Sequence, residues 1–424
     1  MKYIFCITIA CLLTSAASVA QPTATARPTA KPQPAVTTQS AAKPQPAAKP
    51  QPAVLTQPAA KPQPAATPQS KRLLVISGGG ARGAWGVGVI SELVRRHGGY
   101  KAVFGTSTGS LMAPLILLKD FDTLQLAYSN VTQNSIFNKN PFNVTYDPTT
   151  NTVTTSLKTF NALWRFIWGY KTFGESKNLL NLIKQFLTTT RYDSLLQGYH
   201  DSQLTLAVAV TNTKTGKLQM IYDTAFTKDR YDELCHWIWA SANEPLYMSY
   251  VKMGDAYYVD GGVREVIPIQ EGLNYAIDHE IDSIDVVINN ERIPIDQTWN
   301  AGSSGILSGL ERLLDIYDLG TVQYNESYAR LLANYFDQVG ALPHGNANAA
   351  AIPPDSANHY IHLKIYWMPD TLAQKYQNAL GFVQAPMQYL IQQGHLYGAD
   401  TSQHYFKMDV EKAAIRNNQA LLKK

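Results

Sequence analysis

Residues 72–83 of the chain are RLLVISGGGARG, a short apolar run that leads directly into three glycines. The run is rich in Leu, Val and Ile, which is typical of a strand buried on both faces of a parallel sheet. Residues 84–97 carry apolar side chains at helical spacing, and the two glycines at 98–99 are a common helix stop. The segment therefore predicts a strand, a glycine turn and a helix, the opening unit of an α/β fold.

A second glycine motif follows the next predicted strand. Residues 105–109 are GTSTG, placed between a β-prone run at 102–104 and a predicted helix at 110–119. Gly-x-Ser-x-Gly at such a junction is typical of a nucleophile elbow, a tight turn that exposes the serine. One β-α-β unit separates Gly80 from Ser107, and its right-handed crossover places the two strands side by side. We therefore expect the glycine turn to offer an oxyanion site beside a nucleophilic Ser107.

A serine nucleophile needs a base, and residues 260–262, DGG, are the candidate. They follow a β-prone run at 257–259, so Asp260 is predicted at a strand end, held by turn amides. An ordinary Asp-Gly turn explains the same three residues when they are considered alone. The two other motifs favour the base.

Taken in order, these three motifs resemble the patatin-like phospholipase family, over roughly residues 72–370. The resemblance implies a three-layer α/β/α fold with a mainly parallel central sheet, followed by a helical C-terminal extension. It implies a carboxylic ester hydrolase of phospholipase A or lysophospholipase type, which acts on phospholipid or other lipid esters through an acyl-enzyme. One departure is Asn243-Glu244, where the family has small residues. The implied site residues are Ser107 as nucleophile, Asp260 as base, and Gly78, Gly79, Gly80 and Arg82 around the oxyanion.

Other functions remain open at this point. An acyltransferase or a thioesterase would use the same residues, and a non-catalytic exported lipid-binding protein would use the same fold. An α/β-hydrolase triad would need one of the late histidines, none of which lies in a recognisable motif. Cys235 lies beside His236, but neighbouring helical residues point in different directions, so a buried structural cysteine is favoured.

No cofactor is expected. Gly78, Gly80 and Gly83 satisfy G-x-G-x-x-G, yet the second strand carries no acid for a ribose and no Walker lysine follows, so we predict no nucleotide. The His-x-x-His spacing of His359 and His362 lacks further ligands, so we predict no metal.

The amino terminus has the layout of a secretory signal peptide. A positive Met1-Lys2 start, an apolar run at 3–13 and a small-x-small site before Gln21 predict cleavage after Ala20. The apolar run is short of the ~20 residues that span a bilayer. Thr8 stands where a lipobox has leucine, which argues against lipid attachment at Cys11. We therefore expect export to a periplasmic, cell-envelope or extracellular location.

A basic, proline-rich segment separates this leader from the body. Residues 21–70 hold 12 of the 23 prolines, five basic residues and no acid, which predicts an extended linker. With six of the 36 basic side chains in the first 70 residues, 30 remain against 32 acidic ones in the body, so no nucleic-acid footprint is expected. We divide the chain into a leader (1–20), a linker (21–70), a hydrolase domain (71–370) and a C-terminal extension (371–424).

A cluster of aromatic residues at 160–173 has two interpretations. It is either a core helix or a lipid interface and lid, because aromatic rings with polar edges suit both. The second interpretation predicts peripheral contact with a membrane surface.

Overall fold

The central sheet of the protein is built around the first predicted strand. The computed structural model describes residues 70–223, 226–290, 320–324, 327, 360–376, 379–400, 405–412 and 415, all within one compact unit. The predicted leader and all but the last residue of the predicted linker lie outside these ranges. The strands are β1 (Arg72–Ile76), β2 (Ala102–Thr106), β3 (Phe142–Asp147), β4 (Thr152–Leu157), β5 (Thr205–Asn212), β6 (Leu218–Tyr222), β7 (Val251–Met253), β8 (Ala256–Asp260), β9 (Ser283–Ile288), β10 (Tyr360–Trp367) and β11 (Tyr405–Glu411).

In the described part of the chain, nine of these strands form one sheet and β3 pairs with β4 in a separate hairpin. The order is β11-β10-β9-β1-β2-β5-β8-β7, with β6 also paired to β5. The centre, from β10 to β5, is parallel, and β6, β7, β8 and β11 are antiparallel to their neighbours. The predicted mainly parallel sheet is confirmed.

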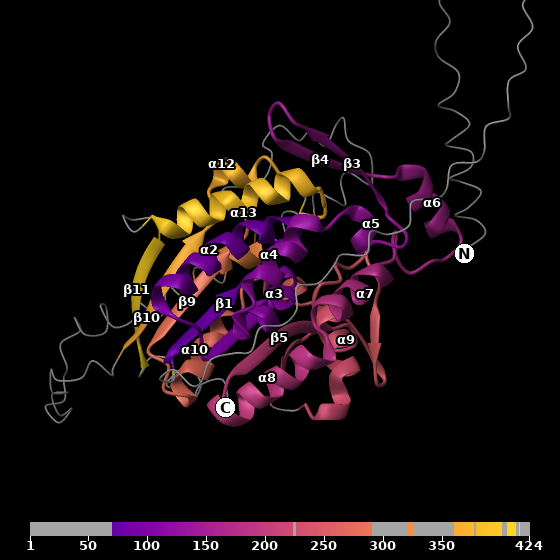
Figure 1. Ribbon diagram of the computed structural model, residues 1–424. Helices are drawn as coiled ribbons and strands as arrows, with labels where there is room; N and C mark the ends of the chain where they lie inside the picture. The colour runs from indigo at the N-terminus through magenta and orange to yellow at the C-terminus, as the bar shows by residue number, and fades with distance from the viewer. Residues whose placement is uncertain are drawn as a thin grey trace, which may run out of the picture. The chain divides into compact units, whose positions relative to one another are not determined.

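Helices cover both faces of this sheet (Figure 1). Leu73 and Val75 of β1 lie in an apolar cluster with Leu273 and Ala276, while Leu74 and Ile76 are equally buried on the other face. Alternation of side chains along a strand produces this division. The helices are α2 (Gly83–His97), α3 (Thr108–Leu117), α4 (Phe121–Asn130), α5 (Gln133–Ile136), α6 (Thr159–Ile167), α7 (Lys177–Phe186), α8 (Thr189–Ser202), α9 (Tyr231–Ser241), α10 (Ile269–Asp278), α12 (Asp370–Ala373) and α13 (Gln384–Ala399). The cluster residues 273 and 276 belong to α10, which lies on the opposite side of the strands from α2 in Figure 1.

The C-terminal extension is more than helical. The sequence predicted a helical segment over 371–424, and α12 and α13 agree with it. Residues 405–411, however, form β11, which hydrogen-bonds to β10 along its whole length and extends the sheet. No helix among the described residues is both long and apolar enough to cross a membrane.

Glycines let α13 pack against α2 at close range. A Cβ on Gly394 would lie inside contact distance of the Trp85 carbonyl oxygen and 3.0 Å from the Gly88 Cα, and a Cβ on Gly88 would overlap the backbone of α13. Because both positions lack a side chain, the two backbones meet directly. The extension is thereby fixed to the helix that follows the glycine loop.

Replacing Gly394 tests this contact. Gly394→Ala forces the helices apart, and the overpacking should destabilise the protein by about 1–3 kcal/mol. The control is Gly320→Ala, where a Cβ would meet nothing within 4 Å. Thermal unfolding should show a midpoint several degrees lower for Gly394→Ala alone. Equal midpoints for the two variants would contradict the close packing.

Candidate active site

Ser107 lies in a strained turn between β2 and α3, as the elbow motif predicts. Its φ of 54° and ψ of −121° are rare for a residue with a side chain. A Cβ on Gly109 would lie 2.5 Å from the Ile76 carbonyl oxygen, and one on Gly105 would overlap the backbone at Gly109. Only glycine fits on either side of the serine, so the turn is fixed by packing.

The backbone of Ser107 is held by two other serines. Its N–H donates to the Ser241 hydroxyl at 3.1 Å, and its carbonyl accepts from the Ser110 hydroxyl at 2.6 Å. Ser107 itself is half-buried, whereas Ser241 and Ser110 are fully buried. No sequence motif marks Ser241, because a serine on α9 reaches this turn only through the tertiary fold.

Strand register brings Asp260 to the same place. β2 hydrogen-bonds to β5 up to the pair Thr106–Ala209, and β8 pairs with β5 starting from Asp260–Val210. Because β6 occupies the opposite edge of β5 at these positions, β2 and β8 lie end to end along one edge. Their carboxyl ends therefore meet, and each is followed directly by its motif, Ser107 or residues 261–262.

Asp260 is buried and oriented by its own turn. Its side chain is 2% exposed, and its Oδ1 accepts a hydrogen bond from the Gly262 N–H at 2.7 Å. Gly261 packs on β5, since a Cβ there would lie 2.5 Å from the Ala209 carbonyl oxygen. The turn amide fixes one carboxylate oxygen, as predicted, which sets the direction in which the other one points.

The glycine loop lies directly against Ser107. A Cβ on Gly78 would be 3.4 Å from the Ser107 Cβ, and the Gly78 N–H already donates to the Val266 carbonyl at 3.0 Å. Gly79 and Gly80 have positive φ angles of 136° and 50°. Within the described residues, no acceptor is recorded for the N–H groups of Gly79 and Gly80. Of the three glycines predicted at the oxyanion site, these two have N–H groups that can donate to a bound ligand.

Arg82 holds this loop in place. Its side chain is 6% exposed, and Nε and a terminal nitrogen donate to the Tyr376 carbonyl at 2.9 and 2.7 Å. Nearby, the Ala81 N–H donates to the Ala379 carbonyl at 2.7 Å. An arginine predicted beside the oxyanion could either supply positive charge or fix the loop, and these bonds favour fixing it. The segment around Tyr376 was not predicted, because it has no sequence signal and lies almost 300 residues from the loop.

Glu265 is a second, half-buried acid beside the elbow. Its carbonyl accepts from the Thr106 hydroxyl at 3.2 Å. Burial, with a smaller contribution from the like charge of Glu271, raises the pKa of the Glu265 carboxyl to about 8. The carboxyl is therefore neutral over most of the range in which enzymes are assayed.

This pKa predicts a pH-dependent stability. Because the folded-state pKa lies above the ordinary 4.5, the stabilisation is present below about pH 4.5 and is lost as the pH rises to about 8. We expect Glu265→Gln to match the wild type in acid and to exceed its unfolding free energy above pH 8, by on the order of 1–4 kcal/mol. Urea unfolding across this range measures the difference, with the exposed Glu280→Gln as control. A difference that is constant with pH would contradict the assignment.

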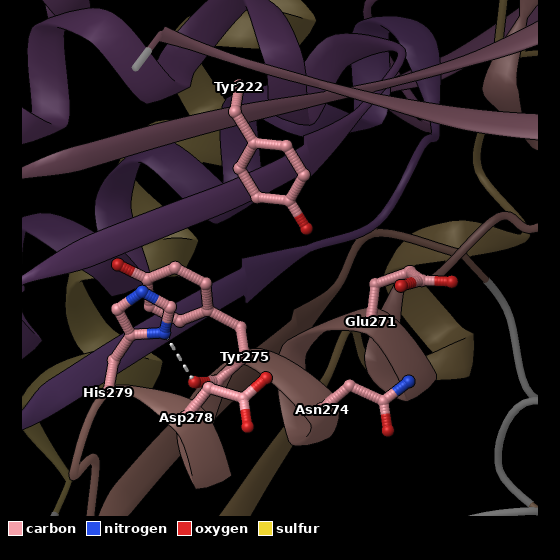
Figure 2. A pocket seen from close by; sticks show the side chains of 6 residues that line it. All are labelled: Tyr222, Glu271, Asn274, Tyr275, Asp278 and His279. Atoms are coloured by element: carbon pink, nitrogen blue, oxygen red, sulfur yellow. Dashed lines mark hydrogen bonds between the residues drawn. The ribbon is translucent and has the colours of Figure 1, made fainter. Parts of the chain in front are cut away.

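A separate cavity of about 400 Å³ lies between β6 and α10 (Figure 2). It is lined by Tyr222, Tyr275, Glu271, Asn274, Asp278 and His279, and the rings of Tyr275 and His279 stack 3.7 Å apart. Tyr222 pairs with Ala207, in the first half of β5, so this cavity lies away from the strand ends that carry Ser107. Its lining holds acids and no Lys or Arg, which does not suit a phosphate group.

The described residues support neither Cys235 as an alternative nucleophile nor a metal site at His362. Cys235 is fully buried, and burial raises the pKa of its thiol to about 11. Among the described residues no cluster of possible metal ligands is found. His362 bonds to Asp409 at 2.7 Å, and His359 lies outside the described residues.

The late histidines that a triad would need are bound elsewhere or lie outside the described residues. His279 stacks on Tyr275, and His395 bonds to Glu92 at 3.1 Å. His344 and His404 fall in undescribed segments.

Comparison with known proteins agrees with these motifs. The model of the family "Patatin-like phospholipase" matches residues 74–273. No curated protein matches the chain. Among solved structures, the crystal structure of VipD from Legionella pneumophila has 14% sequence identity and a TM-score of 0.36, and the match covers 80% of this chain and 68% of that one. Residues 74–273, which match the patatin-like phospholipase family, hold the glycine loop, the Ser107 elbow and Asp260.

Proposed function

We propose that the protein is an exported serine hydrolase that cleaves the carboxylic ester bonds of phospholipids or related lipids through a Ser107–Asp260 dyad. The family implies lipid acyl hydrolysis in general. The dyad is supported by one observation above all: β2 and β8 share an edge of β5, and Thr106 and Asp260 pair with consecutive residues, Ala209 and Val210.

The proposed reaction has two halves. Asp260 accepts the Ser107 proton as Oγ attacks the ester carbonyl, and the N–H groups of Gly79 and Gly80 bind the oxyanion. The C–O bond to the alcohol breaks, Asp260 returns the proton to that alcohol, and the acyl group stays on Ser107. Water then attacks the acyl-enzyme with Asp260 as base, which releases the fatty acid and restores the serine.

Export and membrane contact belong to the same proposal. The leader sequence supports delivery to a periplasmic, cell-envelope or extracellular location. There the enzyme would act as a peripheral protein on a lipid surface, with the proline-rich linker as a spacer.

The dyad is tested by two substitutions. Ser107→Ala removes the nucleophile and Asp260→Asn removes the base, so each should reduce hydrolysis of a soluble short-chain nitrophenyl ester by about a thousandfold or more. The exposed Ser194→Ala, on α8, and Asp255→Asn are the matched controls. A fluorophosphonate probe should label the wild type and Ser194→Ala but not Ser107→Ala. Undiminished turnover in either dyad variant would overturn the proposal.

Arg82 is proposed as a positioning residue. Arg82→Lys keeps the charge but loses the two parallel donors to the Tyr376 carbonyl, so the loop amides should shift from the oxyanion. We expect kcat on the same ester to fall about tenfold or more with KM little changed. Arg95→Lys, on an exposed helical face, is the control. A lower melting temperature with unchanged kcat would show that Arg82 stabilises the fold only.

A further inference from the structure

The largest group of exposed apolar side chains in one short segment of the described chain lies on and just after α6. These side chains are between 50% and 78% exposed. A patch of this kind on a folded protein marks a binding surface. We call this group the α6 surface: Phe160, Trp164, Phe166, Ile167, Trp168 and Tyr170.

The structure decides against the core-helix interpretation of this segment. Within α6 only Ala162 is buried. The helix is nevertheless bonded to the segment that follows it: Arg165 donates to the Thr172 carbonyl at 2.8 Å and to Glu175 at 3.0 Å. Glu175 in turn pairs with Lys139. The aromatic rings are therefore presented by an anchored helix, and those of Trp164 and Trp168 pack against each other 5.5 Å apart.

Two contacts connect the α6 surface to the candidate active site. The preceding strand, β4, bonds through Val153 to the segment at Tyr376, whose carbonyl holds Arg82 and the glycine loop. On the other side, the Lys171 ammonium lies 4.6 Å from the ring of Tyr257, in the strand that ends at Asp260. Figure 1 shows α6 beside the β3–β4 hairpin. A ligand or membrane bound to the α6 surface would therefore lie near the elements that carry Ser107 and Asp260.

The charges around α6 indicate which kind of partner this surface binds. Residues 158–177 contain four basic residues and one acid, and that acid, Glu175, is paired with Arg165. Lys171 and Lys177 are exposed, and no ion pair is recorded for either within the described residues. Aromatic residues flanked by lysines suit the boundary between acyl chains and anionic head groups.

We propose that the α6 surface binds an anionic lipid bilayer, inserting its aromatic residues at the level of the head groups while the nearby lysines contact lipid phosphates. This deepens the proposed function by naming the surface that brings the enzyme to its substrate, and its significance rests on that function. The binding itself requires no chemistry at Ser107.

Vesicle binding tests the proposal independently of catalysis. All proteins carry Ser107→Ala, so that lipid is not consumed, and they are sedimented with vesicles of phosphatidylcholine alone or mixed with phosphatidylglycerol. Trp164→Ser with Trp168→Ser should reduce binding to mixed vesicles about tenfold or more. Lys171→Gln and Lys177→Gln should each reduce it about fivefold, with little effect on neutral vesicles. Thermal unfolding confirms that each variant is folded.

The matched controls replace residues outside the α6 surface. Leu396→Ser removes a side chain that is 65% exposed on α13, and Lys217→Gln removes an exposed lysine; neither should change binding. Failure of the parent protein to bind mixed vesicles, or equal binding by the tryptophan variant, would overturn the proposal. So would concentration-dependent dimerisation that the tryptophan substitutions abolish, since it would assign the surface to a second copy. Undiminished ester hydrolysis by the dyad variants would overturn the proposed function but would leave the vesicle result intact.

Discussion

The edge of β5 that faces β2 is the constraint on which the site depends. Over Thr205–Ala209 this edge bonds to β2, and from Val210 onward it bonds to β8, running in the opposite direction. Two strands that share an edge must both stop where they meet, so the residues that follow them are forced into one small region. A slip of one residue in either strand would turn its side chains to the opposite face of the sheet. The position of Ser107 relative to Asp260 is therefore a property of backbone pairing rather than of side-chain contacts.

Close packing around glycines completes this arrangement. Gly105 and Gly109 allow the elbow to lie on β1, and Gly78 allows the loop to approach Ser107. The loop is then held from outside the matched family region, by carbonyls of Tyr376 and Ala379. Because α13, a few residues further on, packs directly on α2, the C-terminal segment is part of the support of the site. Its removal would take away the Tyr376 carbonyl that accepts from Arg82 and the Ala379 carbonyl that accepts from the Ala81 N–H, at a cost of about 1–3 kcal/mol for each group left buried with that hydrogen bond unmade.

The sequence predicts the structure best where local pattern and chain geometry agree. The apolar run of β1, its glycine turn and the Gly-x-Ser-x-Gly junction each specify their own conformation, and a right-handed crossover places two adjacent parallel strands without further information. Ser241 and Tyr376 could not be found in this way. They act through a hydroxyl and a backbone carbonyl, which carry no motif and are brought in only by α9 and by the segment before α13. β11 was missed for a similar reason, since an edge strand is defined by the neighbour that it pairs with.

The α6 segment shows a different limit of sequence patterns. Its cluster of aromatic residues predicts an apolar surface, but the sequence does not say whether that surface meets the core or a partner. In the fold, the small Ala162 and the ion-paired Arg165 take the inner side, and the large rings are left outside. Burying each ring would stabilise the fold by roughly 1.5–3 kcal/mol. The polar bonds of α6 nevertheless hold the helix in an orientation that leaves the rings exposed. The apolar core on the sheet is complete without α6. The free energy of burying its rings therefore remains available for binding, and the lipid bilayer that we propose as the partner of this surface offers the apolar surroundings that they need.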